Sequence, residues 1–312
     1  MSALAKAVLS GLATRAAILS SVKISRLGVL ALACAALLLM QNSGFVGWID
    51  GNLSAARANL LKRPPTGQIV IVEIDHKSLQ AMGDWPWPRG RFAQTIDTLR
   101  HSGAQLIGFD VDFSLTSNKA DDVALREAIE AMPGAVVLPT FIQHDGSGRN
   151  VPLADLSDSA LIASVNVPLD EDGVVRRYSY GAEIDGRYIA SMGAAFSGQG
   201  YGRHGGFALD YGVDIRRAPR IPIADVLNDR FDPNFFRGKV VLIGATASEF
   251  GDVFKSPTAL TEPGVYIHAL AFENLTQGRG LLQINRWLIL ALAIAVMLAL
   301  WPRRGAMNIG RA

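Results

Sequence analysis

Four near-continuous apolar runs divide the middle of the chain, at residues 68–75, 104–113, 135–141 and 239–244. Runs that do not alternate with polar residues are typical of strands covered on both faces, as in a parallel sheet. Between the first two runs, Phe92, Ile96 and Leu99 recur at helical spacing and Gly103 follows as a stop signal. This order predicts a β–α–β unit. The expected fold class is therefore α/β, with a mainly parallel sheet and flanking helices.

The remaining elements are predicted from shorter patterns. Residues 121–131 and 265–276 read as helices, the former with Asp121 and Asp122 in its first turn, where the helix dipole favours acids. Residues 165–168 and 174–184 read as strands, with turns at 172–173 and 185–186. Three further stretches read as short helices, at 154–163, 188–197 and 223–228.

Two stretches are more apolar than any of these. The first, LGVLALACAALLLM at 27–40, extends with its flanks to 24–48 and so reaches the roughly 20 residues of a bilayer-spanning helix. The second, WLILALAIAVMLALW at 287–301, is short for a span, but Arg286, Arg303 and Arg304 flank its terminal Trp residues as interfacial anchors. The alternative for each is a buried core helix. A cleaved signal peptide is disfavoured because the nearest A-x-A, at 56–58, lies too far downstream.

Charge sharpens this topology. The 312 residues carry 30 basic and 28 acidic side chains, yet residues 50–286 hold all 28 acids and only 23 of the basic residues, a net −5 between two purely basic ends. An acidic body excludes nucleic acid as a partner. The positive-inside bias then predicts a two-pass membrane protein with both termini in the cytoplasm. Its parts would be a cytoplasmic segment 1–23, a span 24–48, a domain 49–286 on the outer side, a span 287–301 and a cytoplasmic tail 302–312.

Candidate ligand-binding chemistry gathers at the ends of the predicted strands. Ligands of open parallel sheets bind beyond the carboxyl ends of the strands. Those ends present Asp75, Asp110 and Asp112, and the loop after the last strand adds Thr246 and Asp252. This acidic rim suits a small ligand or a cation. The alternative is that these residues cap helices and turns, as Asp and Thr often do.

The segment WPWPR at 85–89 is the least random stretch of the chain. Each Pro restricts the Trp before it to an extended shape, and Pro88 suits the first turn of the helix that follows. One interpretation is a rigid corner whose indoles pack on the core. The other is that Trp85 and Arg89 line the ligand cleft, by stacking or by binding a carboxylate.

Catalytic signatures are weak. Asp110-Val111-Asp112 resembles the aspartate pair of haloacid-dehalogenase-type phosphatases, but that chemistry also needs a lysine and a further acidic pair, and no lysine is suitably placed. A G-x-S-x-G motif, a Walker loop and metal-ligand spacing of the five His residues are all missing from the sequence. His268 suits a helix-capping or interface role. We therefore predict no catalytic residue, metal or cofactor.

Seven segments in order nevertheless resemble the CHASE type 2 extracytoplasmic sensory domain. They are VEIDHKSL (72–79), WPWPR (85–89), GAQLIGFDVDF (103–113), DGVVRR (172–177), GKVVLIGATA (238–247), GDVF (251–254) and PGVYIHA (263–269). The resemblance implies a periplasmic sensor domain of bacterial receptors, anchored by one helix and usually followed by three transmembrane helices and a cytoplasmic cyclase, phosphodiesterase or kinase. The ligand of the family is undefined.

The chain departs from that pattern after residue 301, where an eleven-residue tail follows. We therefore expect a truncated receptor or a stand-alone sensory subunit, not an enzyme. The function predicted is to bind an unknown small ligand and to signal through the lipid bilayer, as a homodimer or to a separate cytoplasmic partner. The alternatives are an Asp110-dependent phosphatase and a structural subunit of a membrane assembly.

Overall fold

The computed structural model describes residues 55–142, 148–184 and 186–280, together with Ala35 and residues 288, 291–292 and 294–296. The chain forms two compact units, residues 51–283 and the two ends, 1–50 with 284–312. The predicted spans at 24–48 and 287–301 lie almost wholly outside the described residues. Within the described part of the chain, no helix is both long enough and apolar enough to cross a membrane.

A seven-stranded sheet organises the larger unit. Its order is β10-β1-β11-β2-β3-β4, with β5 also paired to β3. All pairs are parallel except β3–β4, so the mainly parallel α/β prediction is confirmed. The strands are β1 (Ile69–Ile74), β2 (Leu106–Asp110), β3 (Val136–Ile142), β4 (Arg149–Asn150), β5 (Leu161–Ser164), β10 (Arg220–Pro222) and β11 (Val240–Ala245).

Successive residues of the central strands enter two different cores. On β1, Val70 and Val72 pack in the core on one face, whereas Ile69 and Ile71 pack in the core on the other face. All four are fully buried. Because side chains of a strand alternate between faces, a strand covered on both sides must be apolar at every position. This explains why the sheet is visible in the sequence as continuous runs.

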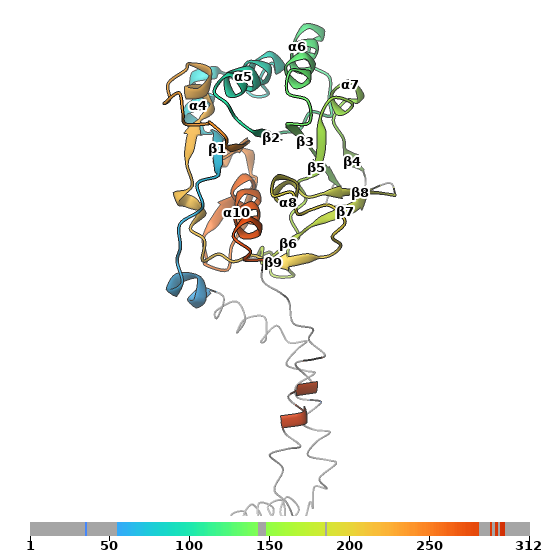
Figure 1. Cartoon of the computed structure of the whole chain (residues 1–312), viewed down its shortest axis with the longest axis vertical. Helices are drawn as coiled ribbons and strands as arrows, with labels where there is room; N and C mark the ends of the chain where they lie inside the picture. The colour runs from blue at the N-terminus through green and yellow to red at the C-terminus, as the bar shows by residue number, and fades with distance from the viewer. Residues whose placement is uncertain are drawn as a thin grey trace, which may run out of the picture. The chain divides into compact units, whose positions relative to one another are not determined.

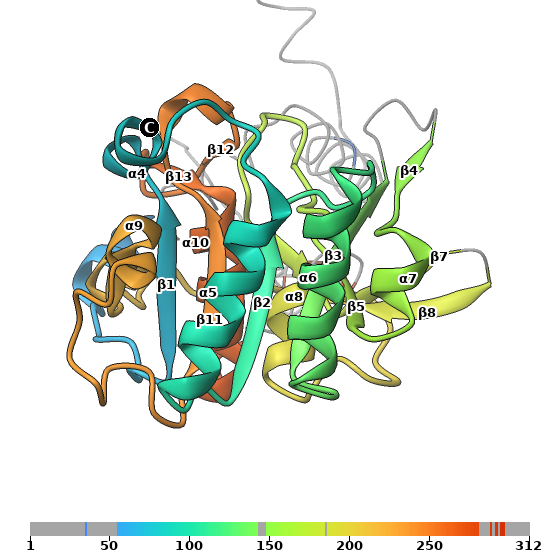
Figure 2. The same ribbon diagram turned by 90° about the horizontal axis from the view of Figure 1, so that it is seen from above.

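Helices cover the two faces unequally (Figures 1 and 2). One face carries α4 (His76–Met82), α5 (Arg89–His101), α6 (Lys119–Glu130), α7 (Ala154–Ser157) and α9 (Ile223–Leu227). The other carries α8 (Met192–Phe196) and α10 (Gly264–Thr276). On α5, Phe92, Ile96 and Leu99 are buried as their spacing predicts. Helix α10 is buried from Gly264 to Leu275, so it lies in the middle of the core on that face of the sheet.

The middle of the chain differs from the sequence prediction. The helix predicted at 154–163 is only α7, and Leu161–Ser164 instead forms β5 against β3. The strand predicted at 165–168 is absent from the structure. The strand predicted at 174–184 is two strands, β6 (Arg177–Ser179) and β7 (Gly181–Ile184).

The helix predicted at 188–197 begins as a strand. Residues Arg187–Ala190 form β8, which pairs with β7 in a hairpin, and only then does α8 begin. Strand β6 pairs with β9 (Gly206–Ala208). Local propensity is weak in such short segments, and pairing with distant strands decides their conformation.

Candidate functional site

A cavity of about 580 Å³ lies at the carboxyl ends of β1, β11, β2 and β3. We call it the strand-end pocket. Its polar lining residues are Asp110, Asp112, Asn166, Asp252 and His268. Its apolar lining residues are Ile74, Trp85, Val111, Pro139, Phe141, Ile142, Val165, Val167, Ala245, Phe250 and Phe254. The position is the one that ligands of open parallel sheets occupy.

Asp110 is the last residue of β2, and its carboxyl group is nearly enclosed. The side chain is 13% exposed, and Oδ2 has no hydrogen-bond partner within the described residues. Burial, reinforced by the charge of Asp252, raises the pKa of Asp110 to about 8. Desolvation disfavours the ionised form of a carboxyl group, and a second carboxylate adds to that cost. Asp110 therefore holds a proton at neutral pH.

His268, on the second turn of α10, faces the same carboxyl group. Its Nε2 lies 3.8 Å from Asp110 Oδ2, which is too long for a hydrogen bond, and its side chain is 2% exposed. Its Nδ1 lies 2.7 Å from the hydroxyl of Tyr178, and that hydroxyl accepts from the backbone N–H of Gly193 at 3.1 Å. The Tyr178 hydroxyl is thus free to donate to Nδ1, which leaves the imidazole proton on Nε2, toward Asp110.

Burial also fixes the charge state of His268. Desolvation lowers its pKa to about 3, so the ring is neutral at pH 7. A neutral imidazole does not balance the charge of the carboxylates around it. The base of the strand-end pocket is therefore a protonated carboxyl group beside an uncharged N–H donor.

Asp252 approaches the pocket from the loop before β12 (Val253–Lys255). Burial raises its pKa. The carboxylate lies against Gly264, the first residue of α10, so closely that a Cβ there would stand 2.4 Å from Asp252 Oδ2. Carboxylates are stabilised beside a helix N-terminus by the exposed N–H groups and the helix dipole. Glycine at 264 thus allows Asp252 to reach both the helix and the pocket.

Asp112 lies at the rim, and unlike Asp110 it has partners. Its Oδ1 accepts from the backbone N–H of Ser114 at 2.8 Å, and its Oδ2 accepts from Nδ2 of Asn150 at 2.7 Å. These bonds hold the loop after β2 against β4. Asp112 contributes negative charge to the pocket while its geometry is set by its neighbours.

Aromatic rings form one wall of the pocket. Trp85 packs edge-to-face on Phe250, with ring centroids 5.0 Å apart, and on Trp87 at 5.2 Å. Trp87 is buried and its Nε1 donates to the carbonyl of Gly83 at 2.9 Å. The two interpretations of WPWPR therefore apply to different residues. Trp87 anchors the corner in the core, and Trp85 presents its ring to the cavity.

Three predicted binding residues do not line the pocket. Arg89 is buried and donates to Asp122 at 2.8 Å and to the carbonyls of Phe113 and Leu115, so it holds the loop between β2 and α6. Asp75 accepts from the Ser78 N–H at 2.8 Å as the N-cap of α4. Thr246 continues the chain beyond β11, where its backbone N–H donates to the Ile74 carbonyl at 3.1 Å.

Two residues of the site, His268 and Tyr178, are not among the predicted binding residues. The sequence predicts only a cap or interface role for His268, because a single histidine at a helix start has no pattern of its own. Tyr178 lies 90 positions earlier in the chain, on β6. The one indication in the sequence is their position in the segments of the family resemblance. Tyr178 directly follows DGVVRR (172–177), and His268 lies within PGVYIHA (263–269).

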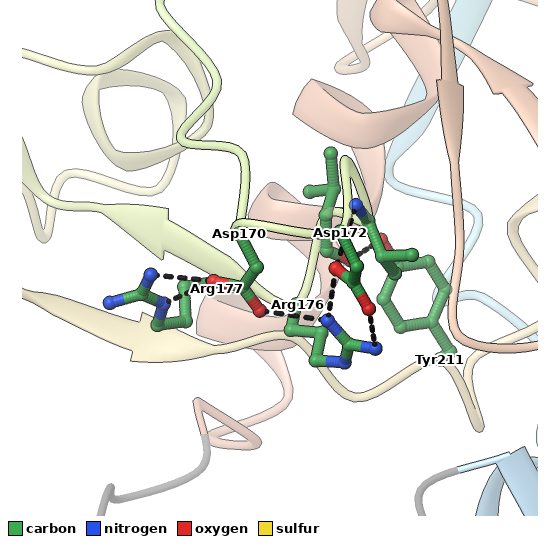
Figure 3. Close-up of polar contacts among 7 residues, drawn as sticks. Asp170, Asp172, Arg176, Arg177 and Tyr211 are labelled. Carbon is green, nitrogen blue, oxygen red and sulfur yellow. Dashed lines mark hydrogen bonds and ion pairs between the residues drawn. The ribbon is translucent and has the colours of Figure 1, made fainter. Parts of the chain in front are cut away.

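Ion pairs hold the segment DGVVRR at 172–177 (Figure 3). Arg176 donates to both carboxylate oxygens of Asp172, at 2.8 and 2.7 Å, and to Asp170 at 3.0 Å. The bonds from Arg176 lower the pKa of Asp172 to about 2. The backbone N–H of Val175 donates to the carbonyl of Lys255 at 2.9 Å. This backbone hydrogen bond joins the loop to β12, which carries the pocket residue Phe254.

The chemistry of this site does not favour the phosphatase alternative. A nucleophilic aspartate must be ionised, whereas Asp110 keeps its proton near neutral pH. The lining contains neither Lys nor Arg to neutralise a phosphoryl group. Within the described residues, no group of three or more His, Cys, Asp or Glu is arranged to hold a metal ion.

Comparison with known proteins agrees with the sensory interpretation of the motifs. The family model of the CHASE2 domain matches residues 29–301 of the chain. No curated protein and no solved structure matches it.

Proposed function

The chain belongs to the CHASE2 domain family, and on this premise we propose that it is a membrane-anchored periplasmic sensor. It binds a small ligand in the strand-end pocket and transmits the resulting change across the bacterial inner membrane to a cytoplasmic partner. CHASE2 is a family of extracytoplasmic sensory domains rather than of catalytic ones. The observation that carries the proposal is the strand-end pocket, at whose base Oδ2 of Asp110 is buried without a hydrogen-bond partner in the part of the chain that the structure describes.

Helix α10 offers a physical route for the signal. Its first two turns contribute His268 to the pocket, and its last turn lies about 8 Å further along at ~1.5 Å per residue. The chain then continues toward the apolar stretch at 287–301. A displacement of α10 at the pocket would therefore reach the predicted second span directly.

The opposite end of α10 also holds the segment that enters the domain. Glu273 accepts from the backbone N–H and the hydroxyl of Thr66, each at 2.8 Å. Asn274 accepts from the Asp210 N–H at 2.6 Å and donates to its carbonyl at 3.3 Å. We call Thr66, Asp210, Glu273 and Asn274 the terminal clamp. Through it, movement of α10 would pull on the chain that leads back to the predicted first span.

Transmission of this kind requires that the ligand bind one position of α10 more tightly than another. The pocket meets this requirement because its lining residues come from three different elements: the sheet, α10 itself and a loop that contacts α10. Asp110 belongs to the sheet, His268 to α10 itself, and Asp252 to the loop that contacts the first residue of α10. A ligand that contacts all three would favour one spacing between the sheet and the helix.

The periplasmic location is tested by labelling single cysteines in spheroplasts. In a Cys34→Ala background, which removes the one cysteine of the chain, Tyr201→Cys places a thiol at a position that is 65% exposed. We expect a membrane-impermeant maleimide to label it in intact spheroplasts. The control Ser2→Cys, in the predicted cytoplasmic segment, should label only after lysis. Labelling of Tyr201→Cys only after lysis would refute a periplasmic sensor.

A further inference from the structure

The lining of the strand-end pocket is acidic and contains no basic side chain that would balance its carboxyl groups. Asp110, Asp112 and Asp252 line it, and its remaining lining residues include neither Lys nor Arg. His268, the one other titratable residue of the lining, is uncharged at neutral pH. A ligand that carries negative charge would find no cationic partner in the lining and would meet acidic groups instead. The electrostatics of the pocket therefore select against anions and favour cations.

The walls of the pocket restrict what kind of cation fits. Eleven of the sixteen lining residues are apolar, and four of these are the aromatic residues Trp85, Phe141, Phe250 and Phe254. A volume of about 580 Å³ lies within the range of small-molecule sites, roughly 300–1,000 Å³. A hydrated metal ion would make no favourable contact with this apolar surface. Aromatic faces attract organic cations through their quadrupole while they bury an apolar body.

One buried polar atom at the base of the pocket lacks a partner. Asp110 Oδ2 is enclosed without a hydrogen bond within the described residues. His268 Nε2 approaches that oxygen to 3.8 Å, which is too long for a hydrogen bond. A buried polar atom without a partner costs free energy that most proteins avoid. Its presence beside a cavity points to a ligand group that binds it.

From this geometry we propose that the strand-end pocket binds an organic ammonium ion with an apolar or aromatic body, its nitrogen held by Asp110 and Asp252. The inference rests on the proposed sensory function and assigns the chemical class of its ligand. The ammonium N–H groups donate to the two carboxylates, and the body lies against the aromatic wall around Trp85 and Phe250.

Binding of such a cation is coupled to release of a proton. The groups that face Asp110 are Asp252 from the loop before β12, His268 from α10 and Tyr178 from β6, and none of them is cationic at pH 7. Asp110 accordingly keeps its proton in the empty pocket. An ammonium ion beside it stabilises the carboxylate form and expels that proton.

Three probes that share a phenyl ring and differ in charge test the assignment. They are 2-phenylethylammonium, the neutral 2-phenylethanol and the anion 3-phenylpropanoate. Calorimetric titration uses the purified full-length chain in lipid nanodiscs at pH 7, in two buffers that differ in ionisation enthalpy. We expect the ammonium to bind at least tenfold more tightly than either other probe, and to release a large fraction of one proton per site.

Matched variants locate the effect. Asp110→Asn should weaken binding of the ammonium at least tenfold and abolish proton release, and Asp252→Asn should weaken it as well. Asp158→Asn removes one charge from an exposed position outside the pocket and should bind as the unmodified chain does. Equal or tighter binding of the alcohol or the anion, an ammonium affinity that Asp110→Asn leaves unchanged, or binding of none of the three probes would overturn the assignment.

These outcomes are separable from failure of the sensory proposal. Tighter binding of the alcohol would refute the ammonium assignment, but the pocket would still be a binding site, as the sensory proposal requires. Labelling of Tyr201→Cys only after lysis would instead refute the periplasmic location, whatever the pocket binds.

Discussion

The two ends of helix α10 treat buried polar groups in opposite ways. At its C-terminal end, Glu273 and Asn274 have all their side-chain oxygens bonded to Thr66 and Asp210. At its N-terminal end, Oδ2 of Asp110, 3.8 Å from His268 Nε2, has no hydrogen-bond partner among the described residues. Satisfied buried networks specify one arrangement, whereas unsatisfied ones are costly unless something else completes them. The clamp end is therefore built for rigidity and the pocket end for a ligand.

The largest expected effect tests the unsatisfied end by pH. Asp110 ionises near 3.8 in the unfolded chain and near 8 in the folded one. Between these pH values Asp110 is ionised in the unfolded state and protonated in the folded state. The contribution of Asp110 to the free energy of unfolding is therefore greatest below about pH 4 and is lost as the pH rises to about 8. Burial lowers the pKa of His268 from 6.5 to about 3, so its own contribution to stability rises with pH up to about 6.5 and offsets that of Asp110 there. We therefore expect the free energy of unfolding to fall by up to about 1.4 kcal/mol per pH unit between about pH 6.5 and 8.

Urea denaturation of the full-length chain between pH 4 and pH 9 measures this loss. Above about pH 6.5, where the contribution of His268 no longer changes, Asp110→Asn should flatten most of the slope, and the remainder should come from Asp252 and Glu262, whose pKa values burial also raises. Asp158→Asn should keep the original slope. An identical slope in Asp110→Asn and the unmodified chain would mean that this carboxyl group is solvated.

The next effect tests the satisfied end. Glu273→Ala removes a fully buried side chain and the two hydrogen bonds that the exposed Thr66 donates to its carboxylate, so we expect a loss of about 3 kcal/mol in the free energy of unfolding. Glu273→Gln keeps one oxygen acceptor and should lose clearly less. Urea denaturation at pH 7 compares the two variants. Equal losses would show that the negative charge of Glu273, rather than its hydrogen bonds to Thr66, stabilises the clamp.

A smaller effect is expected between the two ends. Tyr178→Phe removes the hydroxyl that accepts from the Gly193 N–H and contacts His268 Nδ1. Both groups remain buried, so we expect a loss of about 2 kcal/mol in the free energy of unfolding. The same variant frees His268 to carry its proton on Nδ1, so it should also weaken binding of 2-phenylethylammonium in the calorimetric assay. A loss of stability with unchanged affinity would limit Tyr178 to a packing role.

The smallest effect tests whether the two ends communicate. A double-mutant cycle of Asp110→Asn with Glu273→Gln joins positions on different elements that share no direct contact in the structure. Independent sites add within about 0.3–0.5 kcal/mol, so a coupling energy near 1 kcal/mol would indicate that α10 transmits a change along its length. Urea denaturation of the two single variants and the double variant at pH 7 supplies the cycle. Simple additivity would contradict the route proposed through α10.

Much of the fold could be predicted because its signals are local. Four of the sheet strands and helices α6, α9 and α10 lie within a few residues of their predicted bounds, and α5 contains the three apolar residues whose spacing predicts it. Those strands are buried on both faces and therefore apolar at each position. Strands β5 and β8 lie in segments that the sequence predicts as helix, because four residues are too few to show a strand pattern. Their extended conformation depends on pairing with β3 and β7.

The candidate site could be predicted only in part. Asp110, Asp112, Asp252 and Trp85 line one pocket because parallel strands end at one edge, and that rule is readable from the sequence. Arg89 belongs to the same motif as Trp85, yet its guanidinium is directed to Asp122 in the α5–α6 layer. A motif shows which residues are near in the chain, and the direction of each side chain depends on the packing of the helix that carries it.

The sequence by itself determined the α/β class, the partition into basic ends and an acidic body, and the acidic edge of the sheet, since each follows from residue type and spacing along the chain. Only the tertiary structure decided which acid at that edge is unusual. Asp110, Asp252 and His268 are far apart in the sequence, and their protonation depends on burial and on one another. Desolvation is a property of all the atoms that surround a group, so it exists only once the chain is folded.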